Sequence, residues 1–227
     1  MQNLTQTSKF QSSKNRRMSK RDLASLLLVL VGSGTDAVII LGFNVLTAAQ
    51  TGNTILLSVA LARGDFVTGI SAALSILGFV VGAAVGGLLC RQSGARYPLF
   101  AEFVLMLAAM GSWWMAGATP GPVMLNAVVT VFAGAMGIQS AVIICLHGHP
   151  GTYVTGLLTS FAVALPGAGR EGAAAKLGFL WVLYAAGAVL TGWLFLTFGH
   201  FALLLPIVAL LAATYVLPVN ITGKPSN

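Results

Sequence analysis

The chain alternates between long apolar runs and short polar connections, and this pattern predicts helices that cross a membrane. About twenty residues of α-helix cover the hydrocarbon core of a bilayer. Six runs approach this length, at about 23–43, 66–90, 97–118, 123–146, 177–198 and 201–219. The pattern therefore predicts an all-α fold, a polytopic membrane helical bundle with six transmembrane helices.

Two further segments are too short to be read in the same way. Residues 44–62 and 147–165 each begin polar, pass through a Thr-Gly pair and leave only about ten apolar residues. If both crossed, the eight-span arrangement would place Arg91 and Arg96 outside, although Lys and Arg favour the cytoplasmic side. We therefore expect two re-entrant, discontinuous helices, with eight spans as the alternative.

The apolar pattern also contains an internal repeat. Three blocks recur 104 positions later, and after a one-residue slip Gly82 matches Gly187. The blocks are Ala37-Val38-Ile39-Ile40 with Ala141-Val142-Ile143-Ile144, Thr51-Gly52 with Thr155-Gly156, and Val59-Ala60-Leu61 with Val163-Ala164-Leu165. Three crossings per copy predict that the second copy is inverted relative to the first.

The repeat divides the chain into four parts. Residues 23–118 form the first membrane repeat and 119–219 the second, while 220–227 make a short tail. Residues 1–22 are expected to be a disordered basic tail.

Composition restricts the class of protein. Hydrophobic residues make up 57% of the 227-residue chain and charged residues 7%, which is typical of an integral membrane protein. The net charge of +7 has its main source before the first apolar run, where six of the twelve Lys and Arg residues lie. Such clusters hold an N-terminus in the cytoplasm. We therefore expect the lipid bilayer as partner and no nucleic acid.

Four short motifs make the chain similar to the YoaK-like family over residues 23–219: Asp36-Ala37, Thr51-Gly52-Asn53-Thr54, Gly137-Ile138-Gln139 and Thr152-Tyr153-Val154-Thr155-Gly156. The resemblance implies a multi-pass protein of a bacterial inner membrane with about six spans, and it implies no established substrate. The chain departs from the family pattern at Ala48-Ala49-Gln50, often a Ser-His-Met-like triplet, and at Ser140, commonly Asn. Family roles are not carried over to those positions.

Asp36 is an acid far inside the first apolar run. It lies about 13 residues into that run, which is about 20 Å along a helix. Acids at such depth commonly face a wet cavity and bind cations or relay protons. The alternative is an Asp that only holds helices together through hydrogen bonds.

The Thr-Gly segments are the second candidate site. Thr51, Asn53 and Thr54 are residue types that cap a helix N-terminus, and Gly52 permits close backbone approach. The positive end of such a helix can hold an anionic group such as a carboxylate. Capping alone is the alternative explanation. Tyr153, Thr155 and Gly156 are the corresponding candidates in the second copy.

Two neutral polar residues of the fourth apolar run complete this hypothesis. Ser140 aligns with Asp36 in the repeat, and Gln139 precedes it. Both are candidate solute or ion ligands, while an interhelical hydrogen bond is the structural alternative.

Gly78, Gly82 and Gly86 recur every four residues and predict one helix face without side chains. Such a face permits close packing of helices, either within the chain or in a homodimer.

Two other polar features have ordinary explanations. His147 and His149 form a His-x-His pair, but no carboxylate or thiolate pattern completes a metal site, so none is predicted. Glu102 is expected to reach the membrane interface and pair with Arg96 or Arg91.

The chain lacks paired carboxylates, a nucleophile-base-acid set and a nucleotide-binding fingerprint, so we expect neither an enzyme nor a cofactor. The leading hypothesis is a secondary transporter or permease for a small polar or anionic solute, with Asp36 binding a coupling proton or cation. A channel and a non-transporting scaffold or sensor are the alternatives. A wet central cavity would favour transport, and a packed centre with Asp36 satisfied by its neighbours would favour a scaffold.

Overall fold

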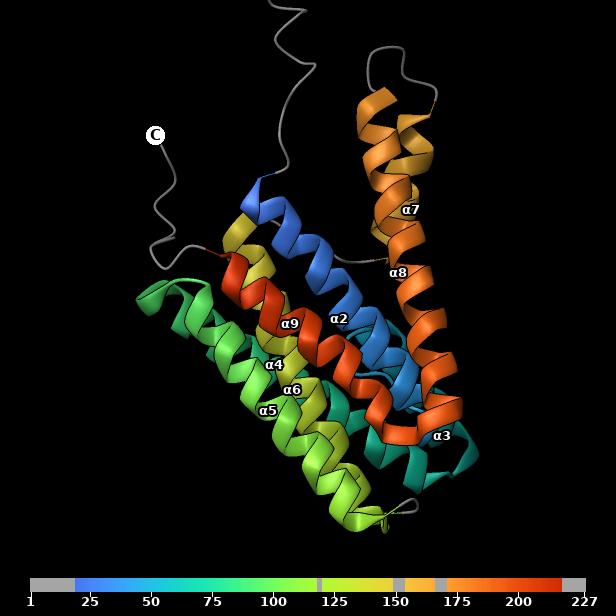
Figure 1. The fold of residues 1–227 in the computed structure, drawn as a ribbon. Helices are drawn as coiled ribbons and strands as arrows, with labels where there is room; N and C mark the ends of the chain where they lie inside the picture. Colours follow the sequence, from blue (N-terminus) through green and yellow to red (C-terminus); the bar gives the residue numbers. More distant parts are fainter. Residues whose placement is uncertain (1–18, 118–119, 149–153, 166–170, 218–227) are drawn as a thin grey trace, which may run out of the picture.

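A computed structural model of the chain describes residues 19–117, 120–148, 154–165 and 171–217. These residues form helices joined by short connections, and no strand occurs among them (Figure 1). The elements are α2 (Lys20–Phe43), α3 (Gln50–Arg63), α4 (Phe66–Ser93), α5 (Arg96–Ala116), α6 (Pro122–His147), α7 (Val154–Ala164), α8 (Glu171–Phe198), η1 (Gly199–Leu203) and α9 (Leu204–Val216).

Every predicted apolar run falls on a helix. Within the described residues, five helical segments are long and apolar enough to cross a membrane, and the last of them, Ala175–Val216, contains α8, η1 and α9. The chain reverses its direction at η1, so α9 runs back beside the bundle (Figure 1). Helix α8 begins at Glu171, ahead of the predicted residue 177, and α2 begins at Lys20. These segments agree with a multi-pass membrane protein.

The turn between α3 and α4 shows how local sequence sets the helix ends. Gly64 ends α3 with φ 69°, a left-handed conformation that glycine adopts without strain. The Asp65 carboxylate then accepts a hydrogen bond from the Thr68 N–H and caps α4. Hydrogen bonding from Thr68 holds the pKa of the Asp65 carboxyl below its usual value.

The glycine face of α4 packs directly on α6. A Cβ added at Gly82 would lie 2.0 Å from the Gly134 carbonyl oxygen, and one at Gly78 would lie 2.5 Å from the Thr130 carbonyl oxygen. A Cβ at Gly86 would lie 2.8 Å from the Ile138 Cα. Close packing through this face is therefore confirmed, and the contact lies within one chain.

Helices α2 and α6 occupy the interior of the bundle. Helix α2 packs against α8 and α9, and α6 packs against α4 and α5. Leu28, Val31 and Val38 of α2 and Phe132 and Val142 of α6 are fully buried. The outer helices instead expose large apolar side chains, as expected where lipid replaces water.

The two Thr-Gly segments form the short helices α3 and α7. They contain 14 and 11 residues, so their lengths are about 21 Å and 17 Å. Neither reaches the roughly 30 Å of the hydrocarbon core. Helix α3 packs on α4 and α7 on α8, toward opposite ends of the bundle (Figure 1).

Polar contacts join three helix ends at one end of the bundle. The Lys176 Nζ lies 3.0 Å from the Asp22 Oδ1, which ties the beginning of α8 to that of α2. The Ser25 Oγ lies 2.7 Å from the His147 Nε2, which places the end of α6 there as well. The turn from α4 to α5 lies at this same end (Figure 1).

Candidate functional site

Asp36 is buried in α2 and binds the segment that leads into α3. Its Oδ1 accepts hydrogen bonds from the Thr47 N–H at 2.7 Å, the Thr47 hydroxyl at 2.9 Å and the Ala48 N–H at 2.8 Å. Its Oδ2 accepts from the Ala49 N–H at 3.1 Å. Three of these four donors are backbone N–H groups, which cannot accept a hydrogen bond from the O–H of a protonated carboxyl. The arrangement therefore matches an ionised carboxylate. Asp36 thus holds the chain immediately before the first turn of α3.

Asn53 fixes the same segment from the other side. Its Oδ1 accepts from the Leu46 N–H at 2.9 Å, while its Nδ2 donates to the Leu46 carbonyl at 2.6 Å. The Nδ2 also lies 2.9 Å from the hydroxyl of Ser75 on α4, and that hydroxyl donates to the same Leu46 carbonyl. Asn53 is therefore fully engaged within the protein.

These contacts correct the predicted capping of α3. The helix begins at Gln50, its N-cap residue is Ala49, and no side chain caps it locally. The Asp36 carboxylate instead accepts from the N–H of Ala49, the N-cap residue, and from the N–H groups of Thr47 and Ala48 just before it. The prediction was wrong because capping rules consider only neighbouring residues, whereas here the acceptor comes from another helix.

Gly52 was expected to permit close approach of its backbone to a ligand, but in the structure a side chain of the protein lies against it. A Cβ at this position would lie 2.5 Å from the Leu46 Cδ1, so the missing side chain makes room for Leu46. The glycine supports the packing of the segment before α3.

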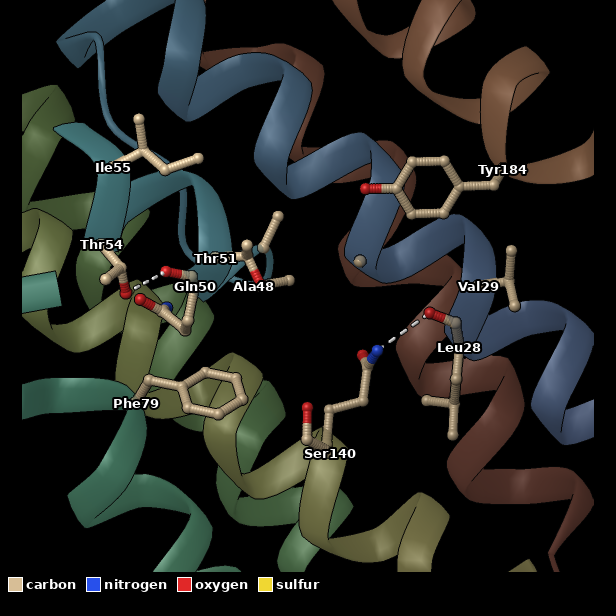
Figure 2. A pocket seen from close by; sticks show the side chains of 13 residues that line it. Leu28, Val29, Ala48, Gln50, Thr51, Thr54, Ile55, Phe79, Ser140 and Tyr184 are labelled. Atoms are coloured by element: carbon tan, nitrogen blue, oxygen red, sulfur yellow. Dashed lines mark hydrogen bonds between the residues drawn. The ribbon is translucent and has the colours of Figure 1, made fainter. Parts of the chain in front are cut away.

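A cavity of about 700 Å³ adjoins the beginning of α3. It lies among α2, α3, α4, α6 and α8 (Figure 2). Its lining residues are Leu28, Val29, Gly32, Ala48, Ala49, Gln50, Thr51, Thr54, Ile55, Phe79, Gln139, Ser140 and Tyr184. The volume is within the range of small-molecule sites.

Gln139 supplies the most unusual polar group of this cavity. Its side chain is buried, and its Nε2 donates to the Leu28 carbonyl at 2.9 Å. Its Oε1 is buried and has no hydrogen-bond partner among the described residues. Because the bond to Leu28 requires the amide nitrogen, the amide orientation is fixed with the oxygen left free. A buried acceptor without a partner is costly and is a reason to expect a ligand.

The structure gathers some predicted site residues and separates others. Four of them line the cavity: Thr51, Thr54, Gln139 and Ser140. Asp36, Gly52 and Asn53 do not line it. Asp36 nevertheless contacts its wall, because Ala48 and Ala49 both line the cavity and donate to the carboxylate.

The structure describes less of the second Thr-Gly segment than of the first. Gly156 lies exposed on α7 and is not among the residues that line the cavity. Tyr153 and the side chain of Thr155 lie outside the described residues.

Among the lining residues that the sequence reasoning missed, three add polar or aromatic side chains. Tyr184 on α8 and Gln50 on α3 add polar groups, and Phe79 on α4 adds an aromatic wall (Figure 2). The signal for Tyr184 was its hydroxyl inside an apolar run, since buried tyrosines need a polar neighbour.

Glu102 on α5 differs from its predicted position. Its side chain is 0% exposed, and neither carboxyl oxygen has a hydrogen-bond partner within the described residues. The predicted pairing with Arg96 or Arg91 is therefore wrong, because the helix turns Glu102 inward. Helix α5 packs there on α6 and α9.

The metal prediction concerned a His-x-His pair at the end of α6. No group of three or more His, Cys, Asp or Glu side chains that could hold a metal ion is found in the described parts of the chain. His147 contacts Ser25, and His149 lies outside the described residues.

Comparison with known proteins gives a family and no function. No curated protein and no solved structure matches the chain. A family model described as "Protein of unknown function (DUF1275)" matches residues 24–216, from the beginning of α2 to the end of α9. The chain therefore belongs to the DUF1275 family.

Proposed function

We propose that this protein is a secondary transporter or permease for a small polar solute in a bacterial inner membrane. The observation that carries the proposal is the partly open cavity at the beginning of α3, which lies between α3 and four longer helices and is lined by Thr51, Gln139, Ser140 and Tyr184. A tightly packed scaffold has no need for such a volume beside a buried acceptor that lacks a partner in the described part of the chain.

The proposal includes two inverted repeats, and two pairs of helix contacts support it. Gly86 on α4 packs against Ile138 on α6, and their repeat partners Thr191 and Gly34 pack together on α8 and α2. In the same way, the contact of Gly82 with Gly134 has its counterpart in Gly187 with Leu30. In both cases the residue on α4 and its counterpart on α8 are 105 positions apart, and the residue on α6 and its counterpart on α2 are 104 positions apart. If the two halves were unrelated, there would be no reason for the contacts in one half to correspond to the contacts in the other.

Six crossings follow from this proposal, with α3 and α7 entering from opposite faces. The Lys and Arg residues of the described chain support a cytoplasmic N-terminus. Lys20, Arg21, Arg91, Arg96 and Lys176 lie where α2 and α8 begin and α4 turns into α5 (Figure 1). Arg63 lies at the other end, at the turn into α4. This distribution follows the positive-inside tendency.

Asp36 would couple a proton to movement of the cavity wall. In the ionised form its oxygens hold Ala48 and Ala49 in place. Protonation would weaken these charge-assisted bonds and loosen the first turn of α3. The coupling role thus acts through the position of α3, without contact between Asp36 and the solute.

Uptake into liposomes tests the proposal. Reconstituted protein should accumulate a solute uphill under an imposed proton gradient and should show counterflow. Asp36→Asn, which mimics the protonated acid, should lose uphill accumulation. Asp22→Asn is the matched control, because Asp22 lies at the beginning of the same helix and pairs with Lys176.

The results also separate the rival functions. Flux that does not saturate and never runs uphill would identify a channel. Absence of accumulation and counterflow for every solute that binds would reject transport in favour of a scaffold or sensor. The complete satisfaction of Asp36 by its neighbours favours that second function.

A further inference from the structure

The polar chemistry of the cavity selects for a particular kind of solute. Its buried anchor is the Gln139 Oε1, which can only accept hydrogen bonds and has no donor among the described residues. The Nε2 of the same amide is held by the Leu28 carbonyl, so the amide cannot reverse to offer a donor. This oxygen has almost no exposed surface, so a solute reaches it only when the cavity wall shifts, and the solute must then bring an N–H or O–H group.

Gln50 and Thr54 are engaged within the protein, and the remaining polar side chains of the cavity can adapt to such a solute. The Thr51, Ser140 and Tyr184 side chains that line it end in hydroxyls, which both donate and accept. They can complete the hydrogen bonding of many neutral polar groups. The fixed requirement therefore comes from Gln139.

An anion finds no matching charge in this cavity. None of the described residues that line it is a Lys, Arg or His. The positive end of α3 is the remaining attraction for an anion. The Asp36 carboxylate already lies beside that end, 2.8 Å from the Ala48 nitrogen and 3.1 Å from the nitrogen of Ala49, the N-cap residue. A second negative charge on the cavity side of these residues would be repelled across one layer of backbone.

We propose that the cavity takes solutes that donate hydrogen bonds and carry no net negative charge, namely neutral amides or hydroxyl compounds and amines. This inference rests on the proposed transport of a small polar solute and removes the anionic class from it. The acceptor of Gln139 recognises the donor group, and Asp36 excludes anions from the beginning of α3.

Four probes with one carbon skeleton test the inference on the purified full-length protein. Adipamide is neutral and donates, hexanediamine is cationic and donates, adipate is anionic, and tetramethyladipamide is neutral without a donor. Thermal unfolding at millimolar probe should show a rise in Tm with adipamide and hexanediamine. Adipate and tetramethyladipamide should leave Tm unchanged.

Two variants assign the preference to the proposed residue. Gln139→Met keeps the length of the side chain and should weaken binding of adipamide about tenfold, the usual effect of losing one buried hydrogen bond. Asn126→Leu is the matched control, because it removes an amide from the same helix at a position that bonds Ser71 and does not line this cavity. Its affinity for adipamide should equal that of the unchanged protein.

Several outcomes would overturn the inference. They are a Tm shift with adipate as large as that with adipamide, equal shifts with adipamide and tetramethyladipamide, or no shift with any probe. If Gln139→Met fails to fold, the comparison of adipamide with tetramethyladipamide on the unchanged protein still decides. A donor preference without uphill accumulation in liposomes would keep this inference and reject transport. Accumulation of an anion without a donor preference would keep the proposed transport and reject this inference.

Discussion

Replacing Gly82 by alanine should destabilise the bundle, because this glycine allows α4 and α6 to touch backbone to backbone. The added Cβ would lie 2.0 Å from the Gly134 carbonyl oxygen and 2.7 Å from the Gly134 Cα. Ordinary van der Waals contact requires about 3.5 Å, so the helices must separate by more than 1 Å at this point. The opening cannot stay local, because Gly78 and Gly86 make similar contacts on either side.

The magnitude follows from two opposed effects. Overpacking costs about 1–3 kcal/mol and occasionally more, and a rigid backbone on both sides places this site at the upper end. Alanine recovers about 1 kcal/mol of helix propensity. We expect a net loss of about 2 kcal/mol in the free energy of unfolding.

Gly87 is the matched control on the same helix. A Cβ there has nothing within 4 Å, so Gly87→Ala should be neutral or stabilising by up to about 1 kcal/mol. Unfolding of both variants by SDS in mixed micelles, followed by far-UV circular dichroism, measures the difference. If Gly82→Ala and Gly87→Ala unfold at the same SDS fraction, the described α4–α6 contact is incorrect.

Two further predictions concern buried acids. Asp36→Ala leaves three backbone N–H groups without their acceptor, at about 1–3 kcal/mol each, and should greatly accelerate hydrogen exchange over residues 46–52. Thr35→Val is its control, since the Thr35 hydroxyl bonds only within its own helix; equal exchange in both variants would contradict the role of Asp36. Glu102→Leu should raise the free energy of unfolding by about 1–3 kcal/mol, because it removes a buried carboxyl without a partner in the described structure. Glu102→Gln, which remains polar, should not reproduce this gain, and a loss of stability in Glu102→Leu would reveal an undetected partner.

Local patterns in the sequence were sufficient for the helices and for the close packing of α4. Apolar run length predicted where α2, α4, α5, α6 and α8 lie, because a helix in lipid must satisfy its backbone internally and cover a fixed thickness. The glycine spacing predicted a face for close contact, because residues four apart share one side of a helix. Neither pattern could name the helix on the other side of that face.

The candidate site was predicted only in part. Thr51, Thr54, Gln139 and Ser140 were selected as polar residues in apolar surroundings, and all four line the cavity. Tyr184 was missed because its position facing α2 and α3 depends on how α8 packs, which residue type does not reveal (Figure 2).

The roles of the buried acids illustrate the limit most clearly. The sequence placed Asp36 and Glu102 in predicted helices but did not identify the partner of either side chain. Asp36 is satisfied by four donors from a distant segment, whereas Glu102 has no partner among the described residues. Hydrogen-bond partners depend on where a chain reversal brings another segment, and helix periodicity contains no such information.

The sequence alone predicted that this protein is a helical membrane protein, where its long helices run and that the two Thr-Gly segments are shorter than these helices. These properties follow from local hydrophobicity and from the thickness of a bilayer. The tertiary structure decided that Asp36 holds the segment before α3, that a cavity forms beside it and that the Gln139 oxygen has no partner among the described residues. The physical reason is that a cavity and its free acceptor arise from the packing of five helices together, and no single helix contains them.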